Sequence, residues 1–219
     1  MLVAIALLTT AIAVQAQTQA HFGIKGGLNM ATLRGNALDD SDSRNGLAIG
    51  AFAILEMPRG FALQPEILFT QWGAKLQPAA LGDEFQWEYR FNYIAIDLLA
   101  RFKFDLNGPV APVVFVGPSL AINTSSNLKF EHEGEVDEYD IGNVKNTDLG
   151  LVLGGGTEID LKKVLVTLEV RYTLGAEGFL EDGTYIANPT DGEVYLVDLD
   201  GQAWDSKHGA LSILIGVAL

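Results

Sequence analysis

The sequence predicts an all-β fold, an eight-stranded antiparallel up-and-down transmembrane β-barrel with short periplasmic turns and long extracellular loops. Apolar and polar residues alternate with the period of two that a strand imposes on its faces. The apolar faces are long enough to cross a bilayer, which takes about 9–11 residues of tilted strand. Short and long connections also alternate along the chain, as in outer-membrane barrels. We therefore expect one barrel domain over residues 17–219.

Residues 1–16 resemble a secretory signal peptide. The segment is uncharged and mostly apolar, and cleavage after Ala16 would make Gln17 the first mature residue. No Lys or Arg precedes the apolar run, which departs from the usual pattern. A helical membrane anchor is the alternative, but it needs about 20 apolar residues, and Gln15, Gln17 and Gln19 end the run too early. We expect an exported chain.

The composition excludes several classes of protein. The chain has no cysteine, which excludes disulfides, thiolate catalysis and a lipoprotein anchor at the cleavage site. The net charge of −14 argues against nucleic-acid binding, because phosphates are bound by Lys and Arg. After the first residues no segment approaches 18 consecutive apolar residues, so we expect no helical membrane span there.

Eight segments with strand character follow one another. Their ranges are 20–32, 46–56, 60–73, 88–104, 110–122, 147–160, 163–176 and 208–219. The clearest alternation lies in the fourth, where Ile96 and Leu98 fall on one face and Asp97 on the other. The same period orders one face of other segments: Phe61, Leu63, Ile67 and Phe69 in the third; Leu149, Leu151, Leu153 and Ile159 in the sixth; Val164, Val166, Leu168, Val170 and Tyr172 in the seventh; Leu211, Ile213, Ile215, Val217 and Leu219 in the eighth.

The two faces of these strands differ in a way that favours a membrane. Bulky aliphatic residues occupy one face, while the other carries small or charged residues that suit a narrow lumen. We expect Ile96, Leu98, Phe102, Leu151, Val166 and Val170 to face lipid, and Trp72, Trp87, Tyr89 and Phe91 to form an aromatic girdle. The alternative is a soluble periplasmic lipocalin-like barrel that binds an apolar ligand in an aliphatic interior.

The connections between the segments set the topology. Short links lie at 56–60, 105–109 and 160–163, and long links at 33–45, 74–87, 123–146 and 177–207. An even number of strands returns both ends of the barrel to the side with the short turns. Tyr185-Ile186 and Tyr195-Leu196 in the last link are expected to extend a hairpin above the membrane.

Charged residues recur on the inward faces of the strands. These residues are Glu66, Asp97, Arg101, Asp148, Glu158, Glu169 and Arg171, and Lys25 and Lys103 are expected to join them. An eight-stranded barrel has room only for side chains, and buried charges need partners. We expect a structural salt-bridge network that plugs the lumen. The alternative is a proton or ligand site inside the barrel.

The last two long links, 123–146 and 177–207, hold half of the acidic residues of the chain. A possible cation or partner site comprises Glu131, Glu133, Glu135, Asp137, Asp198 and Asp200. Ca²⁺ prefers such oxygen ligands, although acidic clusters more often keep a loop solvated. We expect no other metal or cofactor, and we expect these links to be mobile and dispensable for folding.

Catalytic chemistry is not expected. His21, His132 and His208 show neither metal-ligand spacing nor a place beside a candidate serine. The glycines of Gly154-Gly155-Gly156 lie in a strand and no helix follows them, so they do not form a phosphate loop. We therefore predict a protein that is not an enzyme and has no catalytic residues.

Five segments resemble the PorT-family outer-membrane β-barrel proteins. In chain order they are His21-Phe-Gly-Ile-Lys-Gly-Gly-Leu-Asn29, Leu63-Gln-Pro-Glu-Ile-Leu-Phe69 with Gly73-Ala-Lys75, Tyr93-Ile-Ala-Ile-Asp-Leu-Leu99, Val116-Gly-Pro-Ser-Leu120 and Asp148-Leu-Gly-Leu-Val-Leu-Gly-Gly-Gly156. The resemblance covers nearly the whole predicted barrel and implies an OmpX-like eight-stranded barrel. It also implies a further alternative, an accessory protein of a type IX secretion system.

The sequence as a whole predicts a monomeric protein of the outer membrane of a Gram-negative bacterium, surrounded by outer-membrane lipid. We expect a structural or surface-interaction role in the cell envelope, without an open pore. The acidic extracellular links would then contact an extracellular or envelope protein, and no nucleic acid.

Overall fold

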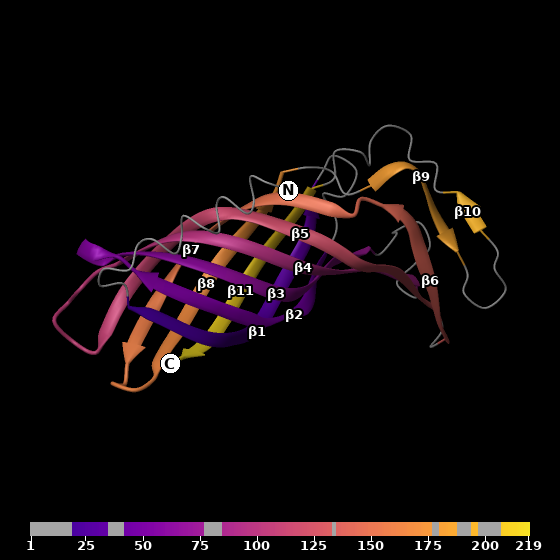
Figure 1. Ribbon diagram of the computed structural model, residues 1–219. Helices are drawn as coiled ribbons and strands as arrows, with labels where there is room; N and C mark the ends of the chain where they lie inside the picture. Colours follow the sequence, from indigo (N-terminus) through magenta and orange to yellow (C-terminus); the bar gives the residue numbers. More distant parts are fainter. Residues whose placement is uncertain are drawn as a thin grey trace, which may run out of the picture.

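The computed structural model describes residues 19–34, 42–76, 85–132, 135–176, 180–187, 194–196 and 207–219. Eight strands in these ranges form a closed antiparallel barrel (Figure 1), so the predicted fold class is confirmed. In the described part of the chain, no helix is long and apolar enough to cross a membrane. The barrel strands are β1 (Ala20–Arg34), β2 (Asp42–Glu56), β3 (Phe61–Leu76), β4 (Phe85–Lys103), β5 (Val110–His132), β7 (Thr147–Asp160), β8 (Leu165–Gly175) and β11 (Lys207–Ala218).

The three short connections lie at one end of the barrel, on the left in Figure 1, and we call this the short-turn end. A 3₁₀ turn, Pro58–Gly60, joins β2 to β3, and its Arg59 and Gly60 have φ angles of 68° and 83°. β1 begins and β11 ends at this end, where they pair with each other. The predicted short links therefore occupy one side of the barrel.

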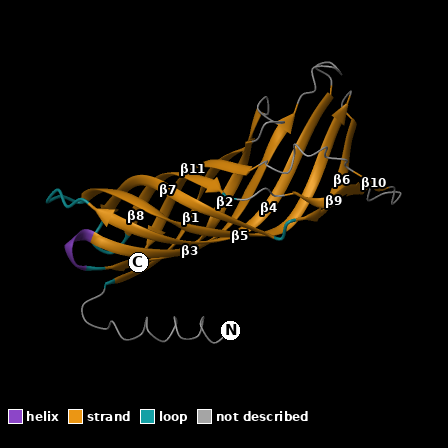
Figure 2. Ribbon diagram, turned by 90° about the horizontal axis from the view of Figure 1, so that it is seen from above, coloured by secondary structure: helices purple, strands orange, loops and turns teal. Residues whose placement is uncertain are grey.

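The opposite end carries an additional sheet, and here the expected loop over 123–146 is wrong. β5 continues to His132 and pairs with β6 (Glu135–Val144), which pairs in turn with β9 (Leu180–Ala187). β9 pairs with β10 (Val194–Leu196) through Ile186 and Tyr195, so the expected hairpin is confirmed. We call β6, β9, β10 and the adjoining ends of β4 and β5 the upper sheet; Figure 2 shows it rising beyond the closed barrel.

Apolar packing explains why this segment is strand. Leu128 of β5 and Ile141 of β6 are buried in one cluster with Trp72, Phe91 and Tyr93. The expected aromatic girdle is therefore wrong for Trp72 and Phe91, which point into the barrel; Trp72 packs on Tyr93 with ring centroids 4.7 Å apart. Tyr89 packs on the same cluster. The side chain of Trp87 lies outside the described residues.

The orientation of the wall matches the membrane interpretation. Ile96, Leu98, Leu151 and Val170 are 44–51% exposed on the outer face, whereas Asp97, Arg101, Glu158 and Glu169 are at most 4% exposed inside. Phe102 and Val166 also point outward and are half-buried. The aliphatic residues do not line the interior, so the lipocalin-like alternative is wrong.

The strand registers place Val166 and Val170 at different heights. Val166 is the second residue of β8 and pairs with Ile159 and Val217, close to the short-turn end. Val170 is the sixth of the 11 residues of β8 and lies at mid-height, where it pairs with Gly155 and Ile213. Val170 therefore marks the level that the middle of a bilayer would occupy.

Glycine lets β7 and β8 approach closely beside the inward charges. A Cβ on Gly156 would lie 2.0 Å from the Leu168 carbonyl oxygen, whereas one on the outward Gly155 would come no nearer than 3.1 Å, to the Val113 oxygen. We expect Gly156→Ala to destabilise the barrel by about 1–3 kcal/mol through overpacking, and Gly155→Ala to cost less. Urea unfolding in lipid bilayers measures both, and equal costs would contradict a close approach confined to the lumen side.

Candidate functional site

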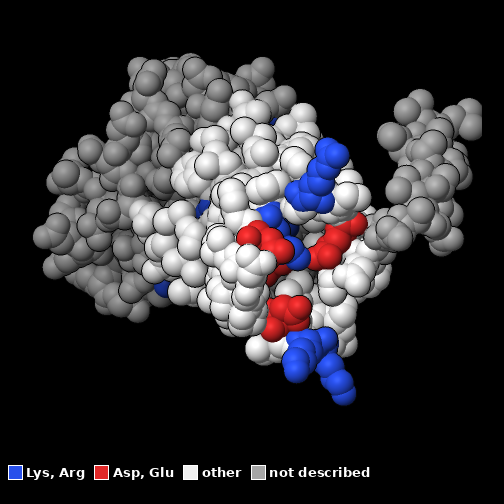
Figure 3. All heavy atoms as spheres, turned by 90° about the vertical axis from the view of Figure 1, so that its left-hand side faces the viewer, with Lys and Arg blue, Asp and Glu red and all other residues white. Residues whose placement is uncertain are grey.

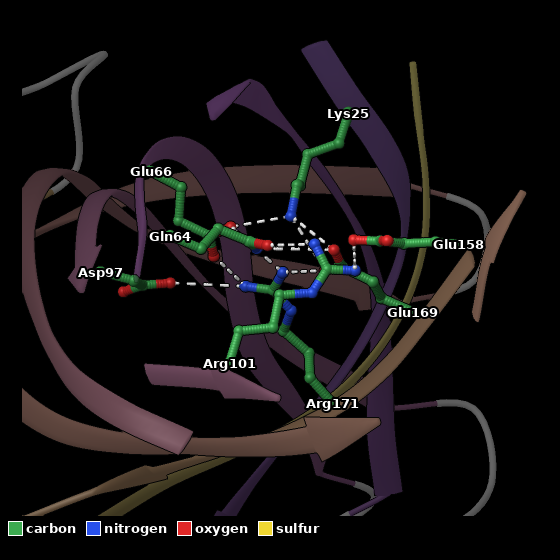
Figure 4. A network of polar contacts seen from close by, with 8 residues as sticks. All are labelled: Lys25, Gln64, Glu66, Asp97, Arg101, Glu158, Glu169 and Arg171. Carbon is green, nitrogen blue, oxygen red and sulfur yellow. Dashed lines mark hydrogen bonds and ion pairs between the residues drawn. The ribbon is translucent and has the colours of Figure 1, made fainter. Parts of the chain in front are cut away.

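Eight polar side chains meet inside the barrel (Figure 4). All project inward because their positions share the parity of the lumen face on each strand. They come from five strands, the first near the start of the chain and the last beyond residue 164. Closure of the barrel brings these strands around one axis. They are Lys25 of β1, Gln64 and Glu66 of β3, Asp97 and Arg101 of β4, Glu158 of β7, and Glu169 and Arg171 of β8, and we call them the lumen network.

Two cations bridge two glutamates at the centre of the lumen network. The Lys25 ammonium lies 2.8 Å from Glu66 Oε2 and 2.9 Å from Glu169 Oε2. The Arg171 guanidinium donates hydrogen bonds to both glutamates, and its Nη1 lies 3.5 Å from Asp97 Oδ2. Phe52 faces Lys25, with the ammonium 4.3 Å from the ring centroid. Every charge in this cluster therefore has an oppositely charged neighbour.

Gln64 connects this cluster to a second one nearer the short-turn end. It donates to Glu66 Oε2 at 3.0 Å and accepts from Arg101 Nη1 at 2.9 Å. Arg101 Nη2 lies 2.8 Å from Glu158 Oε1, and the Lys103 ammonium lies 3.3 Å from Glu158 Oε2. Sequence reasoning placed Gln64 on the inward face but did not assign it to the network. Its position between Arg101 and Glu66 depends on the register between strands.

The structure brings together six of the seven residues that the sequence proposed, with Lys25 and Lys103. Asp148 is also buried and inward, but it is the second residue of β7 and pairs in register with Ala121, closer to the upper sheet. Apolar side chains fill the lumen on both sides of the charges. Toward the short-turn end these are Phe52, Ile54, Ala62, Leu165 and Ala218.

This arrangement is suited to holding strands together. The cations are paired with carboxylates and surrounded by packed side chains, as buried charges require. Within the described ranges, no three His, Cys, Asp or Glu residues are grouped so that they could hold a metal ion.

The predicted acidic site is described only in part. Asp137 lies exposed on β6 and pairs with Phe130. Glu131 and Glu135 lie in β5 and β6, but their side chains are outside the described residues, as are Glu133, Asp198 and Asp200 altogether. Calcium binding by these residues stays a prediction.

A cavity of about 580 Å³ opens at the short-turn end. Figure 3 looks onto this end and shows acidic and basic side chains gathered around the depression. The Lys103 ammonium lies 2.7 Å from Glu56 Oε1, and Asp105, Asp160 and Lys162 also line the cavity. The mouth therefore carries both signs of charge rather than a field of one sign.

A second charged cluster ties the upper sheet to the barrel, and sequence reasoning missed it. Arg44 Nε of β2 and Arg90 Nε of β4 lie 2.6 Å and 3.0 Å from Glu88 Oε1, and Arg90 Nη1 lies 3.7 Å from Glu138 Oε1 of β6. Glu88 precedes Asn92 by four residues in β4. It therefore lies nearer the upper sheet than the exposed apolar residues Ile94, Ile96 and Leu98. Burial opposes its ionisation, but hydrogen bonds from Arg90 and Arg44 outweigh burial and lower the pKa of Glu88 from 4.5 to about 2.

We expect Glu88→Gln to weaken the upper sheet at neutral pH and to weaken it less at pH 3. Because the folded pKa of Glu88 is below its unfolded pKa, the stabilisation is present above pH 4.5 and is lost as the pH falls toward about 2. Hydrogen exchange of β6, compared with wild type at pH 7 and pH 3, measures the effect. Asp137→Asn is the control, since that carboxylate is exposed on β6 and lies outside this cluster. A Glu88→Gln defect that persists unchanged at low pH would contradict this assignment.

Comparisons with known proteins agree with the barrel. A family model for the outer membrane protein beta-barrel domain matches residues 15–177. No curated protein sequence matches the chain. The chain is similar in structure to OprG from Pseudomonas aeruginosa, with 13% identity, a TM-score of 0.48, and coverage of 94% of this chain and 99% of OprG.

Two further solved structures are similar to this chain over most of its length. Neisserial surface protein A shows 16% identity and a TM-score of 0.43, covering 91% of this chain and 98% of that one. Ail, the attachment invasion locus protein of Yersinia pestis, shows 12% identity and a TM-score of 0.40, covering 92% and 99%. At these identities the likeness concerns the fold alone.

Proposed function

The chain belongs to the outer membrane protein beta-barrel domain family, and from this membership we propose that it is a non-catalytic envelope protein that acts through its upper sheet. The barrel would stand in the outer membrane with the short-turn end in the periplasm and the upper sheet outside the cell. The apolar outer wall supports this placement, because a membrane barrel turns its aliphatic face to lipid.

The observation that carries the proposal is the contrast between a filled lumen and an elaborated sheet beyond it. Paired charges and packed apolar side chains occupy the interior, so transport through the barrel is not its role. In the described ranges, the upper sheet is the large structured part that extends past the apolar wall. It is therefore the part available to a partner outside the cell.

The partner that fits best is a protein with a basic surface. Asp137, Glu138 and Asp140 are exposed on β6. Arg90 and Asn127 contact two of these side chains from the side of the barrel. This strand therefore presents acidic side chains to solvent.

The test measures how a basic probe, cytochrome c, binds to whole cells that carry the protein at low ionic strength. We expect the triple variant Asp137→Asn, Glu138→Gln, Asp140→Asn to bind several-fold less, because electrostatic association depends on complementary charge. The matched control is Asp105→Asn with Asp160→Asn, two exposed acidic residues at the short-turn end, which should bind like wild type. Equal binding by the triple variant would refute the acidic surface, and a defect in the control alone would reverse the assigned orientation.

A planar-bilayer measurement tests the absence of a pore. We expect no large, stable conductance from the purified barrel, because an eight-stranded radius filled with side chains leaves no continuous water column. Sustained channels of porin size would refute this part of the proposal.

Three narrower assignments belong to the same proposal. Membership of the PorT family rests on the five segments quoted from the sequence, and export through a signal peptide rests on residues 1–16. A monomeric state is proposed because the barrel closes on itself and leaves no unpaired strand in its wall.

A further inference from the structure

A shallow apolar groove lies on the outer wall where β3, β4 and β5 meet. Its volume is about 360 Å³. Arg101 and Phe115 line it although their side chains are buried and point inward, so their backbone forms the floor. Its outward side chains are Phe61, Ala100, Phe102, Val114 and Val116.

The sequence explains why the wall is recessed at this place. Ala100 presents only a methyl group between the larger outward residues Leu98 and Phe102. The pairing of β4 with β5 stops at Asp97–Ser119 and resumes at Ala100–Val116. Pro118 lies in this interruption and has no N–H to donate to β4. The groove therefore begins beside an interruption of the ladder between the two strands.

Aromatic rings close the groove toward the short-turn end. The rings of Phe61 and Phe102 meet edge to face with centroids 5.0 Å apart, and Phe102 meets Phe104 in the same way at 4.9 Å. Aromatic pairs prefer this edge-to-face geometry, so the three rings stabilise one another at this side of the groove.

The groove is continuous with the apolar wall that faces lipid. Phe61, Val114 and Val116 belong to the set of exposed large hydrophobic residues that surrounds the barrel. The side chains that line the groove on its outer side are apolar. The groove therefore suits part of an acyl chain.

A cation precedes the groove residue Phe61 in the chain, in the turn at the short-turn end. Arg59 is exposed in the turn two residues before Phe61, and among the described residues it has no hydrogen-bond or ion-pair partner. Lys103, the other cation at this end of β4, is already bound to Glu56 and Glu158. Arginine is well suited to phosphate because its planar fork donates two parallel hydrogen bonds.

We propose that this groove binds one phospholipid of the periplasmic leaflet, with an acyl chain over Ala100 and the phosphate at Arg59. The proposal rests on the membrane location given above. It goes further by selecting one lipid, held at one place on the wall, from the lipids that surround the barrel.

The experiment is native mass spectrometry of the full-length barrel released from detergent, titrated with phosphatidylglycerol. We expect wild type to retain one phosphatidylglycerol. Ala100→Phe fills the groove and should lower the retained fraction by about tenfold, and Arg59→Gln should lower it by about five- to tenfold. The control is Ala51→Phe, which adds the same ring to an outward position of β2 away from the groove and should bind like wild type.

A lipid without phosphate separates the two contacts. Diacylglycerol binding should fall in Ala100→Phe but be unchanged in Arg59→Gln. Equal retention by all variants would overturn the groove, as would a dimer of the barrel that Ala100→Phe abolishes, because a second copy would then be the occupant. Equal phosphatidylglycerol retention by Arg59→Gln alone would overturn the phosphate contact.

Membrane insertion and phospholipid binding can be measured separately, so the groove and the proposed function are tested independently. Heat-modifiable gel mobility after insertion into bilayers shows whether each variant folds in a membrane. A wild-type chain that does not insert would refute the membrane assignment. A chain that inserts and retains no phospholipid would refute the groove alone.

Discussion

Replacing Arg171 with methionine should destabilise the folded barrel by about 3–5 kcal/mol, the cost of breaking a buried ion pair by removing one partner. Arg171 binds Glu66 and Glu169 and lies 3.5 Å from Asp97. Without it, Glu66 and Glu169 would both depend on Lys25, and Asp97 would lose its ion pair with Arg171. Methionine keeps much of the length of the side chain and its packing near Phe115, so the loss reports charge rather than volume. Urea unfolding in phospholipid bilayers measures it.

A double variant separates pairing from packing. Glu66→Met combined with Arg171→Met removes one carboxylate together with the cation. The double variant should therefore be less destabilised than the Arg171→Met variant. Lys163→Met is the exposed control and should stay within about 0.5 kcal/mol of wild type. A double variant that costs the sum of its two single changes would show that the lumen network does not act as a unit.

Replacing Val170 with arginine should cost about 2–4 kcal/mol, the range for a cation at the middle of the lipid face of a barrel. Val170 is 51% exposed on the outer wall at mid-height of β8. The guanidinium would therefore leave water for the hydrocarbon core, and no carboxylate lies on that face beside it in the paired positions Gly155 and Ile213. The same bilayer unfolding experiment measures the cost.

Val166→Arg is the matched control for depth. It introduces the same side chain on the same face of the same strand, four residues closer to the short-turn end. Its cost should fall to about 0–1 kcal/mol if this position reaches the interface. Equal costs at Val166 and Val170 would mean that the bilayer is centred elsewhere on the wall.

The sequence by itself determined the wall of the barrel and the direction of its side chains. Alternation is a local property, since consecutive residues of a strand must point to opposite faces. One charged residue such as Asp97, flanked by Ile96 and Leu98, therefore sets the orientation of its whole strand. Proline and glycine in the link at 56–60 likewise predicted the turn between β2 and β3, because the backbone preferences of these two residue types are local.

Only the tertiary structure decided which of these residues meet. Lys25 and Glu169 are 144 positions apart, and their contact depends on the tilt and stagger with which the strands close. The same registers place Gln64 between two charged residues and bring β5, β6 and β9 together beyond the barrel. Alternation within a strand carries no information about its register against a distant strand. The partners in the lumen, the upper sheet and the groove at Ala100 could therefore not be derived from the sequence pattern.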